Sequence, residues 1–177
     1  YRNRLFYEHS KGFITLMRAN AKESYECGKL MAERLNEAKG PVLVVVPLRG
    51  LSMDDTDPTI PNSVGVYCQV FKDGKLEFTN IPWWDPYYDK MNWKGLAEHL
   101  DLSKPNIDLV VVDYNINDPE CTSFCANTMI DMIEGRWKKG EYKHIDPSKI
   151  VKDPEKAYDE LIEYYKSKFP KKDDHPW

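Results

Sequence analysis

Long apolar runs are missing from this 177-residue sequence, and none approaches the roughly 20 residues that a membrane-crossing helix needs. An excess of positive charge is missing too, because 25 Lys and Arg residues stand against 29 Asp and Glu, giving a formal net charge of -4. Nucleic acids and acidic membrane surfaces attract basic proteins. We therefore expect neither nucleic acid nor a membrane as a partner.

The common signatures of nucleotide-binding and hydrolase folds are also missing. No Gly-x-Gly-x-x-Gly follows a predicted strand, and there is no Gly-x-x-x-x-Gly-Lys-Ser/Thr. No Gly-x-Ser-x-Gly nucleophile elbow occurs either. The sequence thus names no catalytic residue and leaves open whether the protein is an enzyme.

Paired cysteines with metal-ligand spacing are absent. Cys27 and Cys68 are isolated, and Cys121 and Cys125 are four residues apart, which puts them on one face of a helix. A structural zinc site usually needs four ligands in tighter pairs, and no His lies nearby in the sequence. We expect no metal site, four free and buried thiols, and a reducing cytoplasm as the location.

The first part of the sequence predicts a β-α-β unit. The short apolar segment Gly12–Arg18 is a predicted strand, and the following helix begins with the capping-box spacing of Asn20 and Glu23 and ends near Gly40. The uninterrupted apolar run Val42–Pro47 is typical of a strand that is covered on both faces. Such a unit implies parallel strands.

The middle of the sequence departs from this rhythm. Alternating residues on both sides of Asp73-Gly74 predict a hairpin of Val64–Phe71 and Leu76–Asn80. We interpret residues of about 56–82 as an insertion at the end of the preceding strand.

The second half returns to alternating elements. Ile107–Asp113 is a second predicted central strand, and three helices are expected to begin at Asp-Pro pairs, at Asp85, Asp118 and Asp153. The fold class is therefore α/β, with a Rossmann-like open parallel sheet of three or more strands, helices on both faces and an inserted β-hairpin. One lobe spans residues 1–177, with a loose tail at about 170–177. Because the chain begins in charged, aromatic sequence without Met, we also expect an upstream lobe, with a removed tag as the alternative.

Polar residues follow both predicted central strands. Since ligands of open α/β sheets gather at the carboxyl ends of the strands, the loops "PLRGLS" and "DYNINDPE" form the candidate site. An arginine, a permissive glycine and a helix N-terminus suit a phosphate or a carboxylate. The candidate ligand-binding residues are Arg49, Gly50, Ser52, Asn115, Asn117 and Asp118.

These residues also have a purely structural explanation. Asn117 and Asp118 would then only cap the helix, and Gly50 would only permit a turn. Arg49 would pair with Asp54 or Asp113 and fix the loop in place.

The segment "PWWDPYY" concentrates aromatic side chains. It could form a lid over a ligand, a surface that contacts another chain, or the packing that anchors the hairpin. Packing or an interface is favoured over ligand stacking. The candidate interface residues are Trp83, Trp84, Tyr87 and Tyr88.

The segments His9 to Arg18, "PLRGLS", Asp85-Pro86 and "INDP" occur in an order and spacing that resemble one family. It is the set of uncharacterised bacterial and fungal proteins related to the ATP-binding domain of the plant tobamovirus-resistance protein. The resemblance extends from about Leu5 to about Ile133. Two departures are the insertion between Thr56 and Pro82 and the presence of Cys121 where the family usually has an aromatic residue.

The resemblance implies the C-terminal lobe of a two-lobed protein that self-associates and binds ATP, with Mg²⁺ as the accompanying ion. It leaves three functional hypotheses. The first is a lobe that binds a nucleotide or another anionic ligand. The second is an enzyme lobe acting on a small phosphorylated or carboxylated metabolite. The third is an interaction module whose aromatic insertion is the working surface.

Overall fold

The computed structural model describes residues 3–10 and 12–169. The tail at about 170–177, which we expected to be loose, lies outside the described residues. In the described part no helix has the length and apolar character needed to cross a membrane. The elements in chain order are β1 (Leu5–His9), β2 (Ile14–Met17), α1 (Ala21–Leu35), β3 (Val42–Pro47), β4 (Tyr67–Lys72), β5 (Lys75–Pro82), α2 (Pro86–His99), β6 (Ile107–Val112), α3 (Pro119–Ile133), the 3-10 turn Pro147–Lys149 and α4 (Pro154–Lys168).

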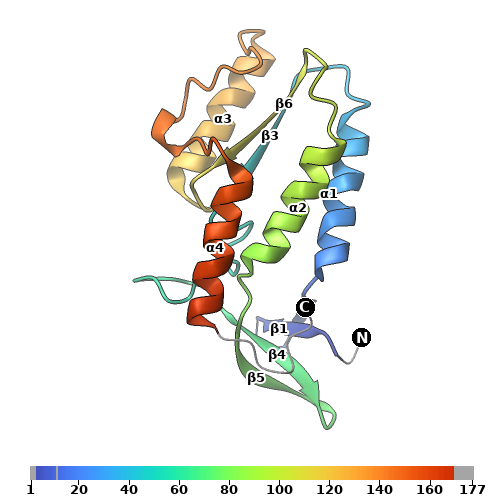
Figure 1. Ribbon diagram of the computed structural model, residues 1–177, viewed down its shortest axis with the longest axis vertical. Helices are drawn as coiled ribbons and strands as arrows, with labels where there is room; N and C mark the ends of the chain where they lie inside the picture. Colours follow the sequence, from blue (N-terminus) through green and yellow to red (C-terminus); the bar gives the residue numbers. More distant parts are fainter. Residues whose placement is uncertain (1–2, 11, 170–177) are drawn as a thin grey trace.

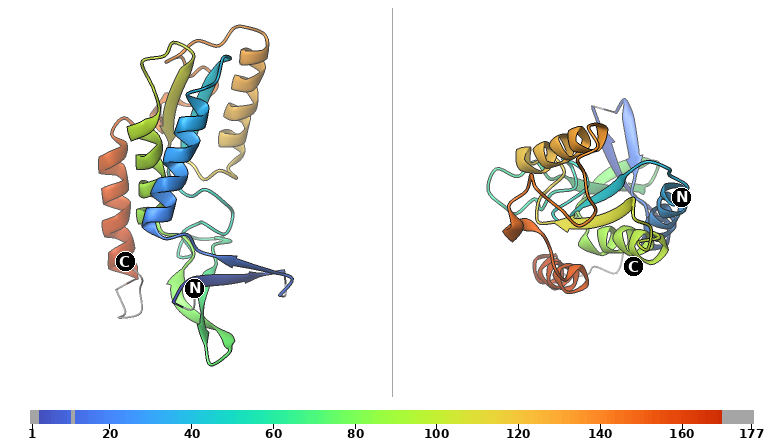
Figure 2. Two further views of the ribbon diagram at one scale, coloured as in Figure 1. Left: turned by 90° about the vertical axis from the view of Figure 1, so that its right-hand side faces the viewer. Right: turned by 90° about the horizontal axis from the view of Figure 1, so that it is seen from above.

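The predicted α/β class is confirmed. Strands β3 and β6 pair in parallel, in a register that places Val42 opposite Ile107 and Pro47 opposite Val112. Helix α3 packs on one face of this pair through Phe124 and Cys121. Helices α1, α2 and α4 cover the other face with a larger apolar core. Figure 1 and Figure 2 show the strand pair between these two helical layers.

The predicted β-α-β unit at the start of the chain is wrong. Strand β2 does not join the parallel sheet but pairs antiparallel with β1, with Phe6 opposite Met17. A tight turn with positive φ at Ser10 and Gly12 makes this pairing local. Closing such a short loop costs little entropy, so the nearest strand is the favoured partner. The prediction failed because the sequence analysis did not identify Leu5–His9 as a strand. The parallel sheet of the described residues therefore has two strands rather than three or more.

The predicted hairpin is confirmed and lies outside the parallel sheet. It turns at Asp73 and Gly74, both with positive φ, as a two-residue hairpin turn requires. Strand β4 also pairs with β1, so the two hairpins form one four-stranded sheet in the order β2-β1-β4-β5. This sheet has its own small core around Leu5, Cys68 and Trp83. The hairpin is thus part of a second packed layer and not a free appendage (Figure 1).

Helices α1 and α2 approach each other through glycines. A Cβ atom added at Gly28 would lie 2.1 Å from the carbonyl oxygen of Asn92, and one added at Gly95 would lie 2.1 Å from that of Tyr25. Any side chain at either position would force the two backbones apart. The contact fixes both the separation of the helices and their position along each other.

The helix starts follow the sequence closely. The capping box of Asn20 and Glu23 is present, and the carboxylates of Asp85 and Asp153 accept backbone N–H groups at the starts of α2 and α4. The predicted end of the first helix at Gly40 is wrong, because α1 ends at Leu35 with Asn36 as its C-cap.

Candidate functional site

The parallel register places Arg49 beside the residues that follow β6. Its backbone N–H donates to the carbonyl of Tyr114 at 2.9 Å, and its Nε donates to Asp113 at 2.5 Å. Lys149 lies 3.6 Å from the other oxygen of Asp113. Partial burial acts to raise the pKa of Asp113, but Arg49 and Lys149 outweigh it and hold that pKa below its usual value. The Arg49–Asp113 pair that the structural explanation anticipated is therefore formed.

Arg49 nevertheless remains available for a further contact. Its side chain is 51% exposed. Within the described residues, the recorded hydrogen bond of the side chain uses Nε and leaves the two terminal nitrogens unengaged. Those two nitrogens are the ones that form a forked contact with a phosphate or carboxylate.

The loop after Arg49 folds tightly over Asn115. Gly50 has φ +129°, and a Cβ atom there would lie 1.7 Å from the backbone oxygen of Asp55. The side-chain amide of Asn115, which is buried, lies at 3.1–3.4 Å from the carbonyls of Arg49, Ser52 and Asp55. Gly50 and Asn115 therefore hold the loop shape and do not present donors to a ligand.

The other predicted site residues also form contacts within the chain. The N–H of Leu51 donates to the Asp55 carboxylate, and the hydroxyl of Ser52 accepts the Asp55 N–H. Asn117 donates to the side-chain oxygen of Asn115 through both its backbone and its amide nitrogen. The expected role of Asp118 as a side-chain cap is wrong, because its carboxylate accepts the Asn115 N–H instead.

A pocket of about 620 Å³ opens at this edge of the parallel sheet. Arg49, Asn115 and Asp118 reach it, whereas Gly50, Ser52 and Asn117 are not part of its wall. Helix α4 forms the opposite side, where the Tyr164 hydroxyl lies 3.1 Å from that of Thr59. The lining residues are Leu48, Arg49, Thr56, Asp57, Ile60, Trp84, Asn115, Asp118, Ala157, Glu160, Leu161 and Tyr164.

The charge of this pocket differs from the expected one. Arg49 is its cationic member, while Asp57, Asp118 and Glu160 are carboxylates. Like charges disfavour a ligand that is negative all over. The wall therefore suits a molecule with one anionic group near Arg49 and with hydroxyl or amino donors elsewhere.

A second hollow of about 890 Å³ lies between α2 and α4. Met91 and Ile162 form part of its apolar lining, and Lys90 at its edge forms ion pairs with Glu155 and Asp159 at 2.5 and 2.7 Å. These pairs join the starts of the two helices. The hollow lies on the other side of α4 from the Arg49 pocket.

The aromatic segment is packing and not an exposed interface. Trp83, Trp84 and Tyr88 are buried within the chain, and Tyr87 is half-buried. Trp84 packs against Tyr165 with ring centroids 5.8 Å apart. The expectation of an interface at these rings is corrected for the three that are buried, because they have no surface to offer a partner. These rings lie at the junction of β5 and α2, where they pack the hairpin against the helices.

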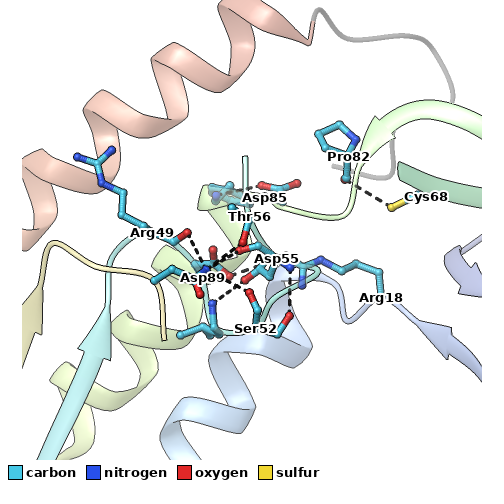
Figure 3. Close-up of polar contacts among 12 residues, drawn as sticks. Arg18, Arg49, Ser52, Asp55, Thr56, Cys68, Pro82, Asp85 and Asp89 are labelled. Carbon is cyan, nitrogen blue, oxygen red and sulfur yellow. Dashed lines mark hydrogen bonds and ion pairs between the residues drawn. The ribbon is translucent and has the colours of Figure 1, made fainter. Parts of the chain in front are cut away.

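A cluster of buried charged side chains lies elsewhere in the described chain, around Arg18 (Figure 3). Arg18 directly follows β2, and its guanidinium lies 3.3 Å from Asp55 and 3.8 Å from Asp89. The rings of Trp83 and Tyr88 each lie 5.3 Å from it. Figure 3 shows that Arg49 points away from this cluster.

Burial dominates the electrostatics of this cluster. Asp55, Asp85 and Asp89 are all buried, and one guanidinium cannot neutralise three carboxylates. Burial raises the pKa of Asp85 to about 7 against the opposing charge of Arg18. Burial also raises the pKa of Asp55, and burial together with the charge of Asp55 raises the pKa of Asp89 well above its ordinary value.

Several polar atoms in this region have no partner among the described residues. They include Nε of Arg18, one oxygen of Asp89 and the Tyr158 hydroxyl. Burial raises the pKa of Tyr158 well above its ordinary value, with Asp89 and Asp55 contributing. The carboxylates of the cluster are thus out of contact with solvent. The described residues contain no group of three or more His, Cys, Asp or Glu side chains placed to hold a metal ion.

Sequence reasoning missed this cluster. The sequence pattern predicts only a helix cap for Asp85 and only the end of a strand for Arg18. A usable signal was present, because Asp85 and Asp89 are four residues apart on one face of α2 and lie among aromatic residues. Two carboxylates in such surroundings need a cation or a proton.

The cysteines are free in the described structure, as expected, but only two of them are buried. Cys68 and Cys121 are buried, and Cys27 and Cys125 are exposed. Burial raises the pKa of the Cys68 thiol to about 12. A hydrogen bond from Cys121 lowers the pKa of Cys125 to about 7, although partial burial opposes this.

Comparisons with known proteins point to one uncharacterised family. Residues 1–62 match the model described as the C-terminal domain of the uncharacterised protein family UPF0261. A UPF0261 protein of Clostridium tetani is 27% identical over 134 residues, which are 76% of this chain and 27% of that protein. A UPF0261 protein of Mesorhizobium japonicum is 42% identical over 57 residues, covering 32% of this chain and 14% of that protein. The matched segments thus span only about a quarter or less of these relatives.

These findings correct the resemblance drawn from the sequence motifs. The matching model and both relatives are described as UPF0261, a family without an assigned function, and nothing in them supports a relation to the ATP-binding domain of the tobamovirus-resistance protein. The motifs around Arg18 and Arg49 lie within the matched residues 1–62. The attribution to another family was wrong, and the self-association and ATP binding that it implied lose that support.

Proposed function

We propose that the chain is part of a UPF0261 C-terminal domain and binds a small molecule in the Arg49 pocket. The ligand carries one phosphate or carboxylate and several hydroxyl or amino donors. The observation that carries the proposal is the pocket of about 620 Å³ at the carboxyl edge of the parallel strands, with Arg49 as its cationic member. Small-molecule sites of open α/β sheets occur at this edge and have volumes of roughly 300–1,000 Å³.

Each wall of the pocket has a distinct role in this proposal. The terminal nitrogens of Arg49 bind the anionic group, while Asp113 holds the guanidinium in place through Nε. The carboxylates of Asp57 and Glu160 accept hydrogen bonds from the donors of the ligand. Trp84 and the apolar side chains beside it cover the rest of the molecule.

A phosphorylated sugar, a nucleotide and a hydroxylated carboxylic acid all meet this description. Nucleotides thus remain among the proposed ligands, and ATP is a suitable probe. An enzymatic role would need an acid and a base that both reach the ligand. Two of the acidic residues at this edge have structural partners, because Asp55 faces the Arg18 cluster and Asp113 is paired with Arg49.

The test is calorimetry on the full chain with ATP, ribose 5-phosphate and a hydroxylated dicarboxylic acid as probes. Arg49→Lys keeps the charge but loses the fork, so we expect roughly ten-fold to hundred-fold weaker binding, as for the loss of a charge-assisted hydrogen bond worth about 1.5–3 kcal/mol.

Arg136→Lys is the matched control. The Arg136 side chain is 55% exposed and is also paired with an aspartate, Asp131, but it lies outside the pocket lining. Binding that responds equally to both substitutions would contradict the proposal. So would the absence of binding heat with all three probes.

A further inference from the structure

One loop of the chain is shared by the Arg49 pocket and the buried cluster around Arg18. Arg49 at the start of this loop lines the pocket, and so do Thr56 and Asp57 at its end. Asp55 lies between them, but its buried side chain contacts Arg18 at 3.3 Å (Figure 3). A movement of Asp55 therefore displaces a wall of the pocket.

Asp55 holds the loop closed through three hydrogen bonds. Its carboxylate accepts the backbone N–H of Leu51 at 2.9 Å. Its own N–H donates to the Ser52 hydroxyl at 3.1 Å, and its carbonyl oxygen lies 3.4 Å from the side-chain amide of Asn115. These bonds fix the turn that begins directly after the pocket arginine.

Two carboxyl groups compete for one nitrogen of Arg18. Its Nη2 lies 3.3 Å from Oδ1 of Asp55 and 3.8 Å from Oδ1 of Asp89. Asp89, in the first turn of α2, is 4% exposed, so solvent screens the repulsion between the two carboxylates only weakly. Asp85, which caps the same helix, adds a third buried carboxyl group. Because one guanidinium cannot balance three negative charges, the charge on the other two decides how firmly Arg18 holds Asp55.

We propose that Asp55 is a positioning residue for the Arg49 pocket, and that ligand binding there weakens when the buried carboxyl groups beside Asp55 ionise. The inference rests on the proposed function, because it concerns binding in the same pocket. New negative charge on Asp85 or Asp89 draws Arg18 away from Asp55. The turn that Asp55 fixes then loosens, and the wall segment that follows it is no longer held against the ligand.

The titration of the cluster sets the direction of the effect. Burial raises the pKa of Asp85 to about 7, and burial also raises that of Asp89 well above its ordinary value. Burial raises the pKa of Asp55 as well, but Arg18 and the N–H of Leu51 support its charge, so we expect Asp55 to ionise first. The other two carboxyls lose protons as pH rises from about 6 to about 8. Because binding favours the less charged cluster, the Kd must rise over this interval.

The other charged and titratable groups that face these carboxyls in the described part of the chain keep their charge over the same interval. They are Arg4, Arg18, Cys68, Tyr88, Tyr158 and Tyr165. Burial raises the pKa of Cys68 and that of Tyr88 to about 12, and it raises the pKa values of both α4 tyrosines above the ordinary tyrosine value. Arginine side chains stay protonated throughout.

The experiment is calorimetry of the full chain at about pH 6, pH 7 and pH 8 with whichever of ATP, ribose 5-phosphate and a hydroxylated dicarboxylic acid binds the wild type. Each Kd is compared with that of the Asp85→Asn/Asp89→Asn double variant, whose side chains keep their size but cannot ionise. The titration of the ligand itself cancels in this ratio. We expect the ratio of the wild-type Kd to the variant Kd to rise about five-fold or more from pH 6 to pH 8.

Two further variants complete the experiment. Asp55→Asn should weaken binding about five-fold or more at all three pH values, although Asp55 lies outside the pocket lining. Glu98→Gln is the matched control, because Glu98 is also a carboxyl group on α2 but its side chain is 46% exposed. It should follow the wild type at each pH. Thermal unfolding should confirm that every variant is folded, and Asp85→Asn alone replaces the double variant if that one unfolds.

The outcomes separate this inference from the proposed function. No binding by any of the three probes at any pH would remove both. Binding with a Kd ratio that is the same at pH 6 and pH 8 would leave the pocket as a binding site and overturn the inference. So would unchanged binding in folded Asp55→Asn, or a pH profile that Glu98→Gln alters as much as the double variant does.

Discussion

Two arginines of this chain form pairs with aspartates in opposite surroundings. The Arg18 side chain is 13% exposed, among three buried carboxylates and two aromatic rings. The Arg49 side chain is 51% exposed and pairs with Asp113 at the mouth of a pocket. The loop of residues 50–57 runs from one arginine to the other and contributes Asp55 to the first.

The difference shows how position decides what an ion pair does. A buried charge without its partner is costly, so we expect the loss of Arg18 to destabilise the chain whether or not the pair itself is stabilising. An exposed pair contributes little to stability and leaves the guanidinium able to bind a ligand. The same residue type is structural in one place and, in the proposed function, binds the ligand in the other.

The largest expected effect is the loss of Arg18. Arg18→Met leaves Asp55, Asp85 and Asp89 buried without a cation, and we expect a loss of about 3–5 kcal/mol in the free energy of unfolding. Urea unfolding followed by tryptophan fluorescence measures it. Arg49→Ala is the comparison and should cost about 1 kcal/mol or less, because its pair is solvated. Equal losses would erase the distinction between the two sites.

A second effect concerns pH. The folded pKa of Asp85, about 7, lies above the ordinary aspartate value, so the folded state binds more protons than the unfolded state between these two pH values. The free energy of unfolding must then fall as pH rises through this window. The raised pKa values of Asp55 and Asp89 act in the same direction.

We therefore expect the chain to be more stable at pH 5 than at pH 8, by an amount on the order of a few kcal/mol. Asp85→Asn keeps a helix-capping side chain but removes the titrating group, and should flatten the profile measured by urea unfolding. Asp153→Asn is the control, since Asp153 caps α4 in the same Asp-Pro context but is exposed. A profile that Asp85→Asn leaves unchanged would contradict this assignment.

A third effect separates two asparagines that the sequence analysis grouped as ligand residues. Asn115→Ala leaves the carbonyls of Arg49, Ser52 and Asp55 without their donor, and we expect a loss of about 2 kcal/mol. Asn117→Ala, at an exposed position, should change the unfolding free energy by less than about 0.5 kcal/mol. Thermal unfolding of both variants suffices. An unstable Asn117→Ala with a stable Asn115→Ala would reverse these roles.

The sequence predicted the features that depend on local chemistry. Apolar runs predicted the parallel pair β3 and β6, and Asp73-Gly74 predicted the hairpin turn. Asp-Pro pairs gave the starts of three helices. These signals lie within a few residues, and each has one dominant physical cause.

Long-range partners were not predictable in the same way. Strand β2 can pair with a local neighbour or join a distant sheet, and its four residues do not distinguish the two outcomes. Arg18 and Asp89 are 71 positions apart, so their contact depends on how the layers assemble. The pocket beside Arg49 lies at the edge that the sequence indicated, because parallel strands bring their carboxyl ends to one edge. The shape of the loop after Arg49 was not predictable, because it depends on the side chain of Asn115.

The glycine contact between α1 and α2 has a mechanical consequence for the pocket. With Gly28 and Gly95 each against a backbone carbonyl, neither helix can slide along the other without a collision. Helix α4 instead meets its neighbours through side chains, among them the Lys90 ion pairs, and has a hollow on each side, one of about 620 Å³ and one of about 890 Å³. Because the hollows lie on opposite sides of α4, any displacement of this helix toward α2 would widen the Arg49 pocket and narrow the other hollow by the same movement.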